Sequence, residues 1–156
     1  MTGEIAIRQA TSEDADSVGR LVYSLIREIV PEFNERRSVD AYSAIAKNLM
    51  ADSPRVWAFV GSDSNGSDIA LLTLHECAAI YAEGIFGEIS ELYVTPDFRS
   101  GGVGAKLIDA AVTFAKQRGW SVLEVGAPDV PRWQKTVDFY RSYGFEMVGP
   151  RLELDL

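Results

Sequence analysis

Three glycines among four residues, Gly101, Gly102 and Gly104, stand directly before one of the clearest helix patterns of the chain. Each glycine in a helical position costs about 1 kcal/mol relative to alanine, so the cluster needs a reason. The residues before it, 87–95, have the composition of a strand that Pro96 ends. A strand, a glycine turn and a helix N-terminus together bind anions, because the first helical amides lack intrahelical partners. The stretch therefore predicts an α/β arrangement with a phosphate-type ligand at the turn.

The rest of the chain alternates in the same way between strand and helix patterns. Residue 144 is a glycine that ends the last helix, and residue 119 is one that caps the helix after the cluster. Segment 77–86 fits neither pattern. Strands are predicted at 4–10, 55–62, 68–76, 87–95, 121–127, 145–149 and 151–156, and helices at 18–29, 38–50, from the glycine cluster to 118, and at 133–143. With 156 residues and no internal repeat, we expect one domain, 1–156.

Charge and composition exclude several classes of function. Lys and Arg number 15 against 23 Asp and Glu, and the net charge of −8 argues against nucleic acid or an anionic membrane as partner. No apolar run reaches the length of a membrane span and the N-terminus lacks a signal-peptide pattern, so we expect a cytoplasmic protein. Cys77 is the single cysteine and His75 the single histidine, which argues against a disulfide and a metal site.

Three phosphate-binding patterns compete for the glycine cluster. The P-loop needs a hydroxyl residue after its lysine, but Leu107 follows Lys106. The dinucleotide fingerprint needs a small residue at its last position, where Leu107 stands again, although Glu124 matches its ribose-binding acid. Too little chain follows for a dinucleotide domain. A nucleotide-binding enzyme, which either of these two patterns would indicate, is therefore the weakest interpretation of the glycine cluster.

The third pattern is V-x-P-x-x-R-x-x-G-x-G, formed by Val94, Pro96, Arg99, Gly102 and Gly104. It resembles the acyl-coenzyme A pyrophosphate loop of the GCN5-related N-acetyltransferases (GNAT), and "DFYRSYGF" resembles the late helix and strand of that family. The resemblance implies an α/β (α+β) three-layer fold, with a central twisted mixed sheet of about six or seven strands flanked by about four helices. It also implies acetyl-CoA as the acyl donor and no metal.

The resemblance assigns the cofactor contacts residue by residue. The pantetheine arm would lie along the strand before the loop, where an amide could also polarise the thioester carbonyl. The pyrophosphate would meet loop amides, and the Arg99 side chain would add charge. Gly101 falls at a variable position of the pattern. The implied residues are Leu92, Tyr93, Val94, Arg99, Ser100, Gly101, Gly102, Val103, Gly104 and Ala105, together with Tyr140.

Direct transfer of the acetyl group to a primary amine of a small molecule or peptide needs a base and an acid. The resemblance gives Tyr140 the role of acid, and Glu88 that of base. Strand alternation places Glu88 on one face with Ser90 and Leu92, and the second candidate, Glu91, on the opposite face. Both carboxylates also fit solvated or ion-paired strand residues, and Tyr140 also fits simple packing.

Other residues carry weaker expectations. Tyr143 is given no chemistry, and Trp133 stands where many members carry a cofactor-binding asparagine. His75 and Cys77 would share a strand face as a nucleophile pair, but direct transfer needs no thiol. Segments 20–45 and 77–86 would shape the acceptor side; their aromatic residues include Tyr23, Phe33, Tyr81 and Phe86.

The alternative function is a non-catalytic acyl-CoA-binding or regulatory module of the same fold. Such a module would keep the glycine loop and lose the acid and base chemistry. Dimers are common in the family, so a homodimer is compatible with either function.

Overall fold

Five strands form a single mixed sheet in which spatial order follows chain order, β1 to β5. The computed structural model describes residues 3–32 and 37–156. The elements are β1 (Ala6–Gln9), η1 (Ser12–Asp14), α1 (Ala15–Ile29), α2 (Val39–Asp52), β2 (Val56–Ser62), β3 (Asp68–Ala79), β4 (Gly84–Val94), η3 (Pro96–Phe98), α3 (Val103–Gln117), β5 (Leu123–Val125) and α4 (Gln134–Tyr143). β1 to β4 pair antiparallel and β5 joins β4 in parallel. The mixed sheet flanked by four helices confirms the predicted fold class.

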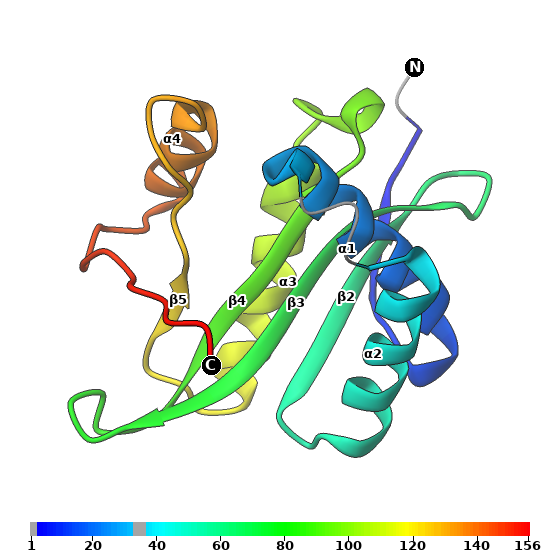
Figure 1. The fold of residues 1–156 in the computed structure, drawn as a ribbon. Coiled ribbons are helices and arrows are strands. Elements are labelled where there is room, and N and C mark those ends of the chain that lie inside the picture. The colour runs from blue at the N-terminus through cyan, green and yellow to red at the C-terminus, as the bar shows by residue number, and fades with distance from the viewer. Residues whose placement is uncertain (1–2, 33–36) are drawn as a thin grey trace.

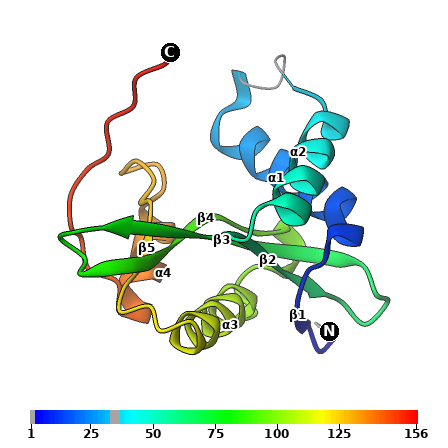
Figure 2. The ribbon, with the colours of Figure 1, turned by 90° about the horizontal axis from the view of Figure 1, so that it is seen from below.

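Helices cover both faces of the sheet (Figures 1 and 2). α1 and α2 lie on one face, and α3 lies on the other with α4 beside β5. Each layer has its own apolar core. Leu107, Ile108 and Ala111 of the predicted α3 stripe are fully buried in one core, and Leu21 of α1 is fully buried in the second. α2 begins where predicted, because the Ser38 side chain accepts a hydrogen bond from the Ala41 amide at 3.2 Å. No described helix is long and apolar enough to cross a bilayer.

Segment 77–86, which the sequence left unassigned, is the tip of the long β3–β4 hairpin. Cys77 pairs with Phe86, and the two strands meet up to Ala79 and Gly84. The pairing shifts between Thr73 and Leu74, which face Glu91 and Ile89, so that Ser90 is an extra residue in β4. Such a β-bulge changes which face the following side chains occupy.

β4 and β5 pair over only three residues each. Gly87 pairs with Leu123 at one end of this short ladder, and Ile89 pairs with Val125 at the other. β4 continues to Val94 along β3, so its last residues have no β5 partner in the described sheet. The two parallel strands therefore part where the glycine turn begins.

The predicted closing strands, 145–149 and 151–156, are wrong. Neither segment has regular structure, which leaves five strands instead of the expected six or seven. Alternating residues such as Leu152 and Leu154 are exposed, and Figure 2 shows this C-terminal tail passing the β5 edge toward the α1 and α2 face. Alternation favours a strand only when a neighbouring backbone is available to pair with it.

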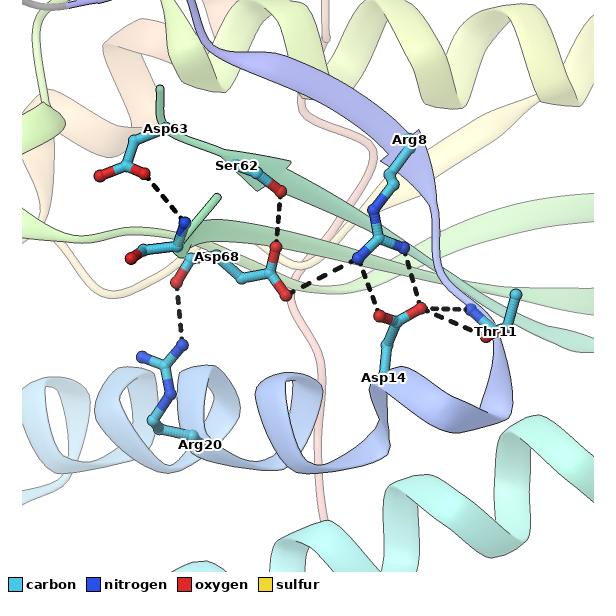
Figure 3. Close-up of polar contacts among 8 residues, drawn as sticks. Arg8, Thr11, Asp14, Arg20, Ser62, Asp63 and Asp68 are labelled. Carbon is cyan, nitrogen blue, oxygen red and sulfur yellow. Dashed lines mark hydrogen bonds and ion pairs between the residues drawn. The ribbon is translucent and has the colours of Figure 1, made fainter. Parts of the chain in front are cut away.

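A polar network ties β1 to the start of α1 (Figure 3). The Arg8 guanidinium donates to both carboxylate oxygens of Asp14, at 2.9 and 2.8 Å, and the Thr11 amide donates to Asp14 at 2.7 Å. Hydrogen bonding from Arg8 is the main cause that lowers the pKa of Asp14 from 3.8 to about 2. Because the folded pKa is the lower one, the contacts stabilise the fold above pH 3.8, and this contribution is lost as the pH falls toward 2.

We expect Asp14→Asn to lower the free energy of unfolding by about 1 kcal/mol at neutral pH, because a half-exposed pair and a helix-start contact are lost. Urea unfolding at several pH values measures the change. The difference from the native chain should shrink as the pH falls from about 4 to about 2. Asp16→Asn, on the first turn of α1, is the matched control, and a pH-independent difference for Asp14→Asn would contradict the assignment.

Candidate active site

The last residues of β4 present one backbone edge to the space between β4 and β5. Leu92, Tyr93 and Val94 pair with β3 on one side, while β5 pairing has already ended at Ile89. These are the positions predicted for the pantetheine arm. The Val94 carbonyl accepts a hydrogen bond from Arg99 Nε at 2.8 Å, so the start of the turn is fixed to the strand.

The glycine turn leaves several backbone amides without a backbone acceptor among the described residues. Ser100 and Gly102 have positive φ angles of 64° and 79°. The Arg99 amide is used internally, donating to the Pro96 carbonyl at 3.2 Å, whereas no amide from Ser100 to Ala105 donates to a backbone acceptor among the described residues. Gly102 caps α3 without a side-chain hydrogen bond and no acid lies in its first turn. The turn therefore offers the kind of free backbone donors that an anion binds.

Two more details describe the surroundings of this turn. The Thr95 hydroxyl oxygen, directly before it, is buried without a hydrogen-bond partner in the described chain. A Cβ on Gly104 would lie 3.1 Å from the Phe139 ring, so glycine there lets α4 approach the start of α3. Gly101 differs, because its Cβ would meet only the Phe98 carbonyl at an ordinary 3.6 Å.

We expect Gly102→Ala to lower the free energy of unfolding by about 1 kcal/mol, because an alanine at φ 79° is strained. Gly101→Ala is the matched control and should change stability by less than about 0.5 kcal/mol. Urea unfolding of both variants makes the comparison. Equal losses would show that the left-handed conformation of Gly102 is not required.

The structure places the Arg99 side chain against α1. Its two terminal nitrogens donate to the Glu28 carboxylate at 2.8 and 2.6 Å, and this hydrogen bonding raises the pKa of the guanidinium. Glu28 also holds Arg132, which donates to its backbone carbonyl at 3.4 Å. Arg99 thus connects α1, the end of β4 and the glycine turn, and no local pattern in the sequence indicates its Glu28 partner.

Tyr140 lies on α4, in the core formed with α3. It is buried, and its ring packs between Phe139 and Phe145. Burial raises the pKa of Tyr140 to about 12, so the hydroxyl stays protonated at neutral pH. The described residues give this hydroxyl no hydrogen-bond acceptor, which leaves its proton available to a ligand. Tyr143, one turn later, instead donates to the Asp109 carboxylate.

The face predicted for Glu91 is wrong. The bulge at Ser90 brings Glu91 to the α1 and α2 face, where its carboxylate accepts a hydrogen bond from Thr73 and its amide donates to Thr73 Oγ1 at 3.1 Å. Glu88 lies on the same face, beside His75. Leu92 packs in the opposite core, so it does not share the face of Glu88 as expected. The prediction assumed regular alternation along the strand, and the extra residue of the bulge interrupts that alternation.

A pocket of about 430 Å³ opens on this face. Glu91, Ser90, His75 and Thr73 contribute its polar lining. The remaining lining comes from α1, α2, β2 and a residue two positions before α2: Val18, Gly19, Val22, Arg37, Tyr42, Ile45, Ala46, Leu49, Met50, Val56, Trp57 and Ala58. Segment 20–45 contributes Val22, Arg37, Tyr42 and Ile45 to this pocket, while 77–86 contributes no lining to it.

The predicted aromatic residues do not meet in this pocket. Tyr23 packs on Tyr42, whose own side chain does line the pocket, and Tyr81 packs on Phe86 at the β3–β4 hairpin. Phe33 lies outside the described residues. Trp133 is the N-cap residue of α4, with the Arg132 guanidinium over its ring.

The Glu88 carboxylate lies beside two residues, Arg151 and His75, that the sequence did not predict as its partners. Arg151 of the C-terminal tail forms an ion pair with its carboxylate, and His75 Nε2 lies 3.8 Å from it. His75 Nδ1 lies 2.7 Å from Ser90 Oγ. Burial lowers the pKa of His75, so the imidazole is neutral at pH 7.

Comparison with known families assigns the central part of the chain. Residues 55–147, more than half of the chain, match the family described as "Acetyltransferase (GNAT) domain". An uncharacterized N-acetyltransferase of Methanocaldococcus jannaschii is 41% identical over 61 residues, which are 38% of this chain and 25% of that protein. Aminoalkylphosphonate N-acetyltransferase of Salmonella typhimurium is 30% identical over 119 residues, which are 76% of this chain and 71% of that protein. The chain thus matches only a quarter of the length of the first relative.

Solved structures share the fold over almost the whole chain. Ribosomal-protein-alanine N-acetyltransferase from Brucella melitensis biovar Abortus superimposes with a TM-score of 0.76 and 20% identity, covering 98% of this chain and 99% of that one. At this identity the likeness establishes the fold and leaves the acceptor open.

Proposed function

Because the chain belongs to the GNAT family of acetyltransferases, we propose that it transfers the acetyl group of acetyl-CoA directly to a primary amine of a small molecule. The observation that carries the proposal is that the described residues combine an unpaired β4 edge, a turn whose amides have no backbone acceptor, and a buried tyrosine with no acceptor of its own.

Acetyl-CoA binds along the β4 edge and the glycine turn. The pantetheine arm adds to the edge of β4 at Leu92 to Val94, and the pyrophosphate binds the amides of Ser100 to Ala105 at the N-terminus of α3. Arg99 holds the turn in this conformation through Val94 and Glu28. Acetyl-CoA supplies the activated thioester; the chain orients it.

The acceptor occupies the pocket on the α1 and α2 face, whose volume suits a small molecule. The Glu91 carboxylate attracts the amine, and the Arg37 guanidinium offers a partner for an acidic group on the same acceptor. We therefore favour a small amine that also carries an acidic group, a class that includes the substrate named for the Salmonella typhimurium relative.

Transfer requires that the amine loses a proton and that the thiolate is stabilised as it leaves. Glu91 accepts the proton, because it lines the pocket while Glu88 is paired with Arg151. The amine nitrogen forms a bond to the carbonyl carbon, and the carbon–sulfur bond breaks. Tyr140 donates a hydrogen bond to the departing sulfur. Its pKa of about 12 exceeds the value near 8.5 of a thiol, so Tyr140 keeps its proton and stabilises the leaving thiolate through the hydrogen bond. The proton taken by Glu91 then passes to solvent.

An acceptor screen tests the proposed activity. Release of free CoA from acetyl-CoA is measured with aminoalkylphosphonates, amino acids, polyamines and peptides, and we expect turnover with a small amine. Tight acetyl-CoA binding by calorimetry without CoA release across the panel would instead support the non-catalytic module.

We expect Tyr140→Phe to lower kcat on the order of 100-fold while the Kd for acetyl-CoA stays nearly unchanged, because only the hydroxyl proton is lost. Steady-state kinetics and calorimetry provide the two values. Tyr143→Phe is the matched control, since its hydroxyl is already used by Asp109 on α3. Full turnover by Tyr140→Phe would remove this residue from the mechanism.

Two carboxylates on one face allow a second comparison. We expect Glu91→Gln to lower kcat on the order of 100-fold, because the amide cannot accept the amine proton. Glu88→Gln should have the smaller effect, since Glu88 is held by Arg151. The same acetyl-transfer assay measures both, and the reverse order would make Glu88 the base.

A further inference from the structure

Three side chains with different donor atoms meet where β3 pairs with β4. His75 and Cys77 alternate along β3 and so share a face, and Glu88 lies directly opposite His75 in the strand register. One donor atom of each, a histidine ring nitrogen, Cys77 Sγ and a Glu88 carboxylate oxygen, lies within 4.8 Å of the other two. All three residues are half-buried.

We propose that His75, Cys77 and Glu88 bind one divalent transition-metal ion of the zinc class. An imidazole nitrogen, a thiolate and a carboxylate form a ligand set that suits Zn²⁺, whereas Mg²⁺ and Ca²⁺ prefer oxygen ligands alone. Three protein ligands leave the fourth tetrahedral position to a water molecule or another small ligand. The sequence argued against a metal because it contains one histidine and one cysteine, but the register adds Glu88 as a third ligand.

Ser90 orients the histidine for this role. Its hydroxyl oxygen lies 2.7 Å from His75 Nδ1, so Nδ1 is occupied and Nε2 is directed toward Glu88, 3.8 Å from Oε2. With the proton on Nδ1, the lone pair of Nε2 faces the carboxylate. Metal-binding histidines are held in this way by a hydrogen bond to the other ring nitrogen. Ser90 occupies this position because it is the extra residue of the bulge.

Arg151 supplies positive charge to the cluster in this structure. Its guanidinium pairs with Glu88, and its side chain is 63% exposed on the C-terminal tail, against 12% for the Glu88 side chain. A divalent ion would neutralise Glu88 in its place and release Arg151. The other charges near the cluster, Glu91 beside His75 and Glu124 beside Cys77, are negative and favour a cation.

The composition of the chain makes the site directly testable. A tag-free chain contains one cysteine and one histidine, so any thiolate-to-metal charge-transfer band originates from Cys77. We expect Co²⁺, used as the spectroscopic probe, to produce this band with saturation at one ion per chain, and Zn²⁺ to displace it. Cys77→Ser should abolish the band, while His75→Gln and Glu88→Gln should each weaken Co²⁺ binding by at least about tenfold.

Two further variants separate loss of ligands from loss of folding. Arg151→Gln removes the competing cation from an exposed position, and we expect Co²⁺ to bind several-fold more tightly. Glu91→Gln, on the same face but outside the trio, should change affinity only a few-fold. Circular dichroism confirms that each variant is folded.

Three results would overturn the proposal: an equal band in the urea-unfolded chain, unchanged affinity in His75→Gln or Glu88→Gln, or weaker binding in Arg151→Gln. The measurement involves no acetyl transfer, so its outcome is independent of the proposed enzymatic function.

Discussion

The backbone pairing of β4 is the constraint on which the rest of the structure depends. β3 pairs with β4 along its whole length, whereas β5 pairs with it only from Gly87 to Ile89. Backbone amides and carbonyls in a sheet interior need partners, so the unpaired end of β4 is a place where a ligand gains hydrogen bonds that the protein itself does not use. The glycine turn continues directly from this edge, and α4 closes on it through Gly104 and Phe139. The proposed cofactor site is therefore a consequence of where two parallel strands part.

The bulge at Ser90 has an equally large effect on the opposite face. One inserted residue brings Glu88 and Glu91 to the same side of the sheet, and it places the Ser90 hydroxyl on His75. Each carboxylate then acquires a different partner: Glu91 is held by Thr73 inside the pocket, and Glu88 is paired with Arg151. This difference in partners is the basis for proposing Glu91 as the proton acceptor, whereas the proposed ion binding by Glu88 rests on its closeness to His75 and Cys77.

The residues that the sequence predicted well belong to local motifs. Gly102 requires a positive φ angle, and the uncapped start of α3 follows from the same short stretch, so both were readable from neighbouring residues. The helices were predicted from their apolar stripes and caps, as Ser38 illustrates. The prediction for the C-terminal tail was wrong, because its alternation predicted strands but no described strand pairs with it. Pairing depends on residues far away in the sequence.

The sequence by itself determined the order of the strands and helices from β1 to α4, the glycine turn before α3 and the position of Tyr140 on a helix, because periodicity, glycine and capping residues act over a few neighbours. Only the tertiary structure decided which carboxylates share a face, that Arg99 pairs with Glu28, and that His75, Cys77 and Glu88 meet. These outcomes depend on the register between strands and on contacts between distant segments. A one-residue bulge reverses the face of every side chain that follows it, and no local pattern in this chain marks its place.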